Sequence, residues 1–234
     1  MEGCIIFLVV GALFLILFLL EKCRRYSIKE TIIKGLTSLT FVGLGIHNFA
    51  YLSFHPLGLL VLIGLICGLF GDIFLELKYS HKVHSRFYTY AGFVSFAIGH
   101  IFYITGMMLY LYQSYEWYSF VIPFTIGIMG GIALLLVEKP LKLNYGEYKI
   151  ITVIYTVFLL SMVGTSGYLA ISNLFQITTY NMLFIAGVLF AISDLILSGT
   201  YFGIGKERPI DLISNSVTYY AAQFLIAFSL FFIV

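Results

Sequence analysis

The chain has 234 residues, of which 61% are hydrophobic and only 10% are charged, with a formal net charge of +2. Its mean hydropathy is +1.01, whereas charged residues make up about 25% of an ordinary soluble domain. These values exclude an ordinary soluble domain and predict an all-α integral membrane protein surrounded by membrane lipids, with no nucleic-acid partner.

Apolar runs of about 20 residues, long enough to cross a bilayer, recur along the whole chain with short polar gaps between them. They predict a bundle of eight transmembrane helices in a single transmembrane domain, residues 1–234, at about 3–20, 32–52, 56–77, 88–112, 117–137, 149–172, 180–200 and 211–234. The first run is followed by "EKCRR" instead of a small-residue cleavage site. We therefore expect it to be a retained helix, not a cleaved signal.

The basic residues predict the orientation of the bundle. All 13 flank the gaps after the first, third, fifth and seventh predicted helices: Lys22, Arg24, Arg25, Lys29, Lys34, Lys78, Lys82, Arg86, Lys139, Lys142, Lys149, Lys206 and Arg208. Cytoplasmic loops are enriched in Lys and Arg, so both termini are expected on the non-cytosolic side. The basic face would also suit anionic lipid headgroups.

Two aspartates lie inside predicted membrane helices. Asp72, in "GLFGDIFLELK", and Asp194, in "LFAISDLILSG", each come about six residues before their helix ends. Both helices run toward the basic side, so the carboxylates are expected at the same depth, about 9 Å from the helix end. A charged group in a bilayer costs roughly 2.5–3.5 kcal/mol, which makes both aspartates candidates for function.

Small residues share a helical face with each aspartate, which predicts that both carboxylates point into the bundle. These residues are Gly64 and Gly68 in the third helix, and Gly187, Ala191 and Ser198 in the seventh. The aspartates are 122 positions apart, and "FGDIFL" resembles "ISDLIL". This separation suggests two parallel four-helix repeats.

Other polar residues could line the same pocket from the remaining helices. They are Lys34, His100, Tyr103, Thr152, Tyr155, Thr156, Asn215, Tyr219 and Gln223. Any single one could instead hydrogen-bond between helices or anchor a helix at the interface.

Two carboxylates in one buried pocket tend to share a single proton, which supplies one acid and one base. Glycosidases use such a pair to pass through an oxocarbenium-like state. The same pair could protonate the β-carbon of a vinyl ether lipid and activate water at the adjacent carbon. Composition alone does not select this chemistry.

The ordered motifs resemble the YhhN family of eight-helix membrane proteins, which includes the animal transmembrane protein 86 lysoplasmalogenases. They are Lys34, "GLFGDIFL" at 68–75, "FYTYAGFVSFAIGHIFYI" at 87–104, "VIYTVFLLSM" at 153–162, "GVLFAISDLIL" at 187–197 and "TYYAAQFLI" at 218–226. The family usually has Lys-Pro in its second helix, whereas here Gly35 follows Lys34.

The resemblance implies hydrolysis of the vinyl ether bond of a lysophospholipid substrate, with Asp72 and Asp194 as catalytic residues and no metal or other cofactor. Lys34 would contact the substrate phosphate, and the orienting residues would be His100, Tyr103, Tyr155, Asn215, Tyr219 and Gln223. It also implies the endoplasmic reticulum membrane in a eukaryote, or the inner membrane in a bacterium.

Other functions remain open. A proton-coupled transporter also uses carboxylates within the bilayer. An intramembrane aspartyl protease would need glycine where Phe70 stands, and a zinc hydrolase would need clustered ligands, whereas His100 is the one mid-helix histidine. A lipid-scaffold protein would need no chemistry at all.

Overall fold

The computed structural model describes residues 2–22, 28–50, 55–111, 116–203 and 208–233. These contain eight α-helices: α1 (Glu2–Lys22), α2 (Ile28–Phe49), α3 (Pro56–Ser80), α4 (Ser85–Leu111), α5 (Tyr118–Val137), α6 (Lys149–Ser172), α7 (Thr178–Phe202) and α8 (Pro209–Ser229).

Every predicted helix is therefore present. The predicted ends at 52, 112 and 234 fall outside the described residues, and the other predicted ends differ from those observed by at most four residues. Three of the basic residues used to predict the orientation, Arg24, Arg25 and Lys206, also lie outside the described residues.

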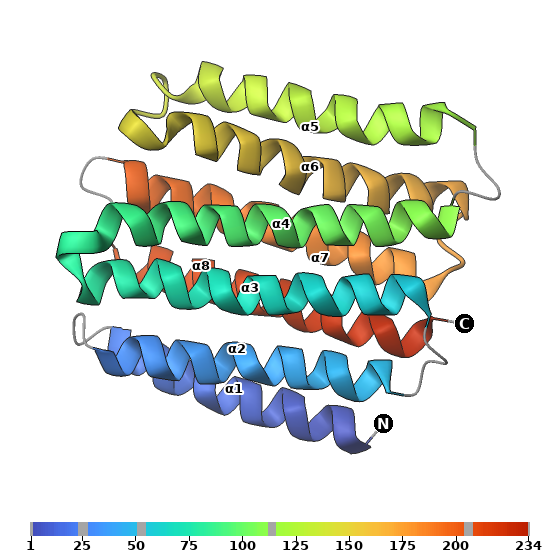
Figure 1. Ribbon diagram of the computed structural model, residues 1–234, viewed down its shortest axis with the longest axis horizontal. Helices are drawn as coiled ribbons and strands as arrows, with labels where there is room; N and C mark the ends of the chain where they lie inside the picture. The colour runs from blue at the N-terminus through green and yellow to red at the C-terminus, as the bar shows by residue number, and fades with distance from the viewer. Residues whose placement is uncertain (1, 23–27, 51–54, 112–115, 204–207, 234) are drawn as a thin grey trace.

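Six of the helices form a ring. The helices lie side by side along one direction, and both chain ends are at the same end of the bundle (Figure 1). Going round the ring, α2 packs on α3, α3 on α4, α4 on α6, α6 on α7, α7 on α8, and α8 on α2. The other two helices flank it, α1 against α2 and α5 against α6. The ring surrounds a space to which six helices contribute side chains.

The packing of the first four helices repeats in the second four. α1 packs on α2 as α5 packs on α6, and α3 packs on α4 as α7 packs on α8. The contact of α4 with α6 corresponds to that of α8 with α2. Two four-helix units in the same orientation would produce this pattern, in which α3 and α7 are equivalent. A sequence relation between the two halves stays a prediction.

Six of the helices, α1 and α3 to α7, are long and apolar enough to cross a membrane, as judged over the described residues. The two helices below that threshold, α2 and α8, carry buried polar side chains that lower their hydropathy. Thr37, Ser38 and Asn48 of α2 and Ser216 and Gln223 of α8 are all buried. The protein is therefore a multi-pass, all-helical membrane protein, while the eight-span count stays a prediction.

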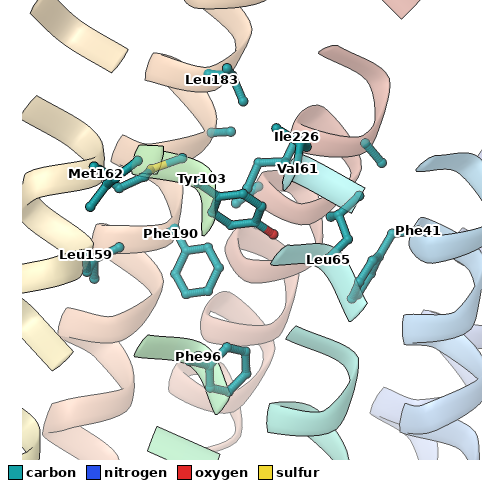
Figure 2. Packing of buried hydrophobic residues seen from close by; sticks show 14 of the residues in the cluster. Phe41, Val61, Leu65, Phe96, Tyr103, Leu159, Met162, Leu183, Phe190 and Ile226 are labelled. Carbon is teal, nitrogen blue, oxygen red and sulfur yellow. The ribbon is translucent and has the colours of Figure 1, made fainter. Parts of the chain in front are cut away.

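Aromatic and aliphatic side chains from the ring helices meet in its centre (Figure 2). Tyr103 and Phe190 are almost fully buried there. The predicted close approach along the small face of α3 is present: a Cβ on Gly64 would lie 2.2 Å from the Tyr103 ring, and one on Gly68 would lie 2.7 Å from the Gln223 amide nitrogen. The missing Cβ atoms thus let α4 and α8 close on α3.

Candidate functional site

A cavity of about 480 Å³ lies within the ring and extends toward α5, and both Asp72 and Asp194 line it. Asp72 lies eight residues before the last residue of α3, and Asp194 lies eight before the last residue of α7. Each aspartate therefore lies about 12 Å from the end of its helix, not about 9 Å, and their common depth in a membrane stays a prediction.

The candidate residues fall into two groups around this cavity. Six besides the aspartates line it directly: Lys34, Thr152, Tyr155, Thr156, Asn215 and Tyr219. The other three, His100, Tyr103 and Gln223, lie behind the lining and contact it: His100 packs on Tyr155, and Gln223 joins Tyr103 to Tyr219.

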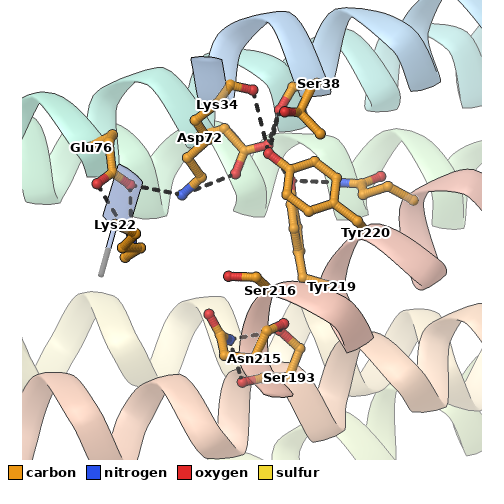
Figure 3. Close-up of polar contacts among 12 residues, drawn as sticks. Lys22, Lys34, Ser38, Asp72, Glu76, Ser193, Asn215, Ser216, Tyr219 and Tyr220 are labelled. Atoms are coloured by element: carbon orange, nitrogen blue, oxygen red, sulfur yellow. Dashed lines mark hydrogen bonds and ion pairs between the residues drawn. The ribbon is translucent and has the colours of Figure 1, made fainter. Parts of the chain in front are cut away.

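Asp72 is almost fully buried and receives three donors (Figure 3). The Ser38 hydroxyl donates to Oδ2 at 2.6 Å, and the Tyr219 hydroxyl donates to the same oxygen at 2.7 Å. The Lys34 ammonium lies 3.5 Å from Oδ1. An ionised carboxylate only accepts hydrogen bonds, so this set of donors matches the ionised form. Oδ1, with only the longer Lys34 contact, retains capacity for a further donor.

A hydrogen-bond relay supports Tyr219 from behind. The Gln223 amide nitrogen donates to the Tyr219 hydroxyl at 3.0 Å, and the Tyr103 hydroxyl donates to the Gln223 carbonyl at 3.5 Å. Every donor in this relay points toward Asp72. Tyr103 and Gln223 thereby orient the Tyr219 hydroxyl, although neither reaches the cavity.

Asp194 has a simpler environment. It is half-buried, and the Tyr155 hydroxyl donates to its Oδ2. Its neighbour Ser193 is hydrogen-bonded to α8: the Asn215 amide nitrogen donates at 2.8 Å to both the carbonyl oxygen and the hydroxyl of Ser193. Asn215 thus holds α7 beside α8 where Asp194 enters the cavity.

Aromatic rings connect the surroundings of the two aspartates. Phe96 packs against both Tyr155 and Tyr219, with ring centroids 6.5 and 6.0 Å apart, and Phe190 packs against Tyr219 at 5.2 Å. Behind this wall His100 is 1% exposed, and neither of its ring nitrogens has a hydrogen-bond partner among the residues that the structure describes. Its ring contributes to packing there.

Sequence reasoning missed a third carboxylate, Glu76, and its partner Lys22. Glu76 is 1% exposed, and its Oε2 lies 3.3 Å from both the Lys22 and the Lys34 ammonium groups. Lys34 therefore bridges Asp72 and Glu76 (Figure 3). The sequence could have indicated Glu76, because it follows Asp72 by four residues and therefore lies one turn along the same face of α3.

The connection between α5 and α6 covers one end of the cavity. Leu143 forms an isolated antiparallel bridge with Gly203, and the Asn144 amide donates to the Phe202 carbonyl at 2.9 Å. Tyr145 is 1% exposed and hydrogen-bonds Ser198 at 3.0 Å.

Glu138 stabilises the start of this connection. It pairs with Lys149 at 2.7 Å and accepts a hydrogen bond from the Tyr145 amide at 3.4 Å. The hydrogen bond from Lys149 lowers the pKa of the Glu138 carboxyl, so the pair persists until the pH falls through that lowered pKa.

Within the described parts of the chain, no group of three or more His, Cys, Asp or Glu side chains is placed to hold a metal ion. The site consists of two carboxylates with unlike hydrogen-bond partners in one largely apolar cavity. Such a pair can supply one proton donor and one proton acceptor to the same bound molecule.

Comparison with known proteins identifies a family for the chain. The profile of the YhhN family matches residues 29–230, from the start of α2 to the end of α8. No curated protein and no solved structure matches the chain.

Proposed function

The chain belongs to the YhhN family, and from this premise we propose that it hydrolyses the vinyl ether bond of lysoplasmalogens. The products are a fatty aldehyde and glycerophosphoethanolamine or glycerophosphocholine. The membrane would be that of the endoplasmic reticulum in a eukaryote or the inner membrane in a bacterium.

The observation that carries the proposal is the unequal set of donors around two aspartates in one cavity. Asp72 accepts two hydroxyl hydrogen bonds and faces the Lys34 ammonium, whereas Asp194 accepts one hydrogen bond, from Tyr155. We assign Asp72 as the ionised base, because its donors match a carboxylate that only accepts. Asp194 is then the proton donor.

The reaction balances with water alone. Asp194 gives its proton to the β-carbon of the vinyl ether, and the adjacent carbon becomes an oxocarbenium ion stabilised by the negative charge of Asp72. Asp72 takes a proton from water as the water oxygen bonds to that carbon. The hemiacetal then collapses: Asp72 gives its proton to the glycerol oxygen, which leaves as an alcohol, and Asp194 takes the hydroxyl proton as the aldehyde forms, so both aspartates return to their starting protonation.

This arrangement changes the role expected of Lys34. Its ammonium already contacts Asp72 at 3.5 Å and Glu76 at 3.3 Å. We therefore propose that Lys34 positions Asp72 and balances its charge, and that it does not primarily bind the substrate phosphate.

The test is aldehyde release by the purified protein in lipid nanodiscs given a lysoplasmalogen in heavy water. Protonation at the β-carbon predicts one deuterium on the aldehyde carbon next to the carbonyl, detected by mass spectrometry after reduction to the alcohol. Asp72→Asn and Asp194→Asn should each lower kcat roughly 10²- to 10⁴-fold, the usual contribution of acid–base catalysis. Unchanged thermal unfolding would show that both variants fold.

Two results would overturn the proposal: no aldehyde from the wild-type protein, or full activity in either folded variant. A proton-coupled transporter would instead move a solute into liposomes without consuming lipid. Transporters often bind substrate at broken helices, whereas α3 and α7 continue unbroken through Asp72 and Asp194.

A further inference from the structure

The lining of the cavity is divided into a buried part and an exposed part. Around the aspartates it is aromatic and buried, as at Phe96 and Phe190. Away from the aspartates, six residues that line the cavity are also exposed on the outside of the bundle. We call this group the α5–α7 mouth: Ala133 and Val137 of α5, Leu141 just after α5, and Val188, Ile192 and Leu195 of α7. The cavity therefore reaches the surface at this point.

The mouth lies between two helices that rest on a third. α5 and α7 both pack on α6, and Thr156, Leu160 and Val163 of α6 line the cavity between them. Val188, Ile192 and Leu195 repeat at four- and three-residue steps, as do Gly130, Ala133 and Val137. Each set forms one face of its helix, so the mouth is a groove with two aliphatic sides and α6 as its floor.

This groove opens sideways, toward the hydrocarbon of the membrane. The end of the cavity is covered by the connection between α5 and α6, where Leu143 bridges Gly203 and Tyr145 hydrogen-bonds Ser198. α5, α6 and α7 are all apolar enough to cross a membrane, and every residue of the mouth is aliphatic. A lipid chain can pass such an opening without leaving an apolar environment.

One end of the cavity is polar and the other is not. Lys22 and Lys34 line it on the side of α1 and α2, whereas the mouth lies on the side of α5 and α7. Asp194 follows Ile192 by two residues and therefore lies at the inner edge of the mouth. A lipid with one chain and a polar headgroup would match this polarity, with its ether bond near Asp194.

We propose that the α5–α7 mouth is the binding site and passage for the single hydrocarbon chain of the substrate, which enters the cavity sideways from the bilayer. The chain lies along α6 between α5 and α7. This inference rests on the proposed function for the identity of the reacting bond, but the binding of the chain can be tested without any reaction.

The first experiment measures binding alone. The probe is a saturated 1-O-alkyl lysophospholipid, which has no vinyl bond to cleave, with a diazirine in its chain, in nanodiscs. Photolysis should label Leu160 and Val163 on the floor of the mouth, and excess unlabelled alkyl lysophospholipid should compete for that label. Label confined to outward residues such as Ile132 and Ile185, and not reduced by competitor, would overturn the inference.

The second experiment fills the mouth. Ala133→Trp and Ile192→Trp place a ring in the groove, and each should reduce saturable labelling and raise KM for a long-chain lysoplasmalogen at least tenfold. The matched controls are Ile132→Trp and Ile185→Trp, at exposed positions on the same helices outside the cavity lining, and both should behave like the wild type.

The outcomes separate the two proposals. If the wild type releases no aldehyde but the labelling pattern holds, the proposed reaction is wrong and the chain site stands. If aldehyde release and saturable labelling are the same in Ala133→Trp, Ile192→Trp and the wild type, the reaction stands and the inference is wrong.

Discussion

Lys34 is the residue that joins the two buried carboxylates of α3. Its ammonium lies within ion-pair distance of both Asp72 and Glu76, and its side chain is only 13% exposed. With Lys22 as the second cation, the cluster has two positive and two negative charges. Removing one partner of a buried ion pair leaves the other uncompensated, at a cost of about 3–5 kcal/mol.

We therefore expect Lys34→Met to lower the free energy of unfolding by about 3–5 kcal/mol. Adding Glu76→Gln to Lys34→Met removes the excess negative charge, so the double variant should recover a large part of that loss. Thermal unfolding in nanodiscs would measure both variants together with Glu76→Gln alone. A double variant as unstable as the sum of the two single variants would show that Lys34 and Glu76 are not coupled.

The positions of the aspartates near the ends of α3 and α7 could be predicted from the sequence, but their partners could not. Asp72 and Asp194 were recognisable because a carboxylate in an apolar run is rare and costly. The donors to Asp72 come from α2 and α8, and which helices become neighbours depends on the closure of the ring. Ser38 is an ordinary polar residue in the sequence, and only the packing of α2 on α3 gives it a role.

At the scale of the element, α3 is a helix whose surface fits closely against its neighbours. Its glycines leave space that α4 and α8 fill with large side chains, so α3 can carry Asp72 deep into the bundle. A Cβ at Gly64 would lie 2.2 Å from the Tyr103 ring. That ring is buried by surrounding side chains and has little room to move.

Gly64→Ala should therefore lower the free energy of unfolding by about 1–3 kcal/mol, the usual cost of overpacking. The matched control is Gly199→Ala in α7, where a Cβ would meet no atom within 4 Å. Since alanine forms helix better than glycine, that control should be neutral or stabilised by up to about 1 kcal/mol. Equal effects of the two substitutions in thermal unfolding would contradict the packing explanation.

For α2 and α8, hydropathy indicates the position of the helix but not whether its polar residues are buried. Long apolar runs predicted the positions of all eight helices, because each run must bury its backbone in a helix within the bilayer. Yet these two helices are the least apolar, since they supply buried polar groups such as Ser38 and Gln223. These polar side chains are buried inside the protein, so the lower hydropathy of α2 and α8 does not mean that they face water.

At the scale of the whole molecule, the packing of the first four helices is nearly repeated by the second four, but the two halves contribute different parts of the cavity. In the first half, Lys22 of α1 pairs with Glu76 of α3. In the second half, the space between α5 and α7 is lined by aliphatic residues and opens outward. One half thus supplies the charged end of the cavity and the other supplies its apolar end.

The orientation of the whole chain follows from its loops and can be measured. If α2 and α8 cross the membrane, the connection between α3 and α4 lies on the opposite side from both chain ends. Its basic residues predict that it lies in the cytosol. Val83 is the best reporter there, because it is 91% exposed.

In a background with Cys4, Cys23 and Cys67 replaced by serine, Val83→Cys should react with a membrane-impermeant maleimide only after the membrane is permeabilised. Tags at the two chain ends should be accessible without permeabilisation. The control for that side is Trp117→Cys, because Trp117 lies between α4 and α5 and is 71% exposed. An N-terminal tag on the same side as Val83 would mean that α2 does not cross. A C-terminal tag on that side would mean the same for α8, and the ring could not then surround an intramembrane site.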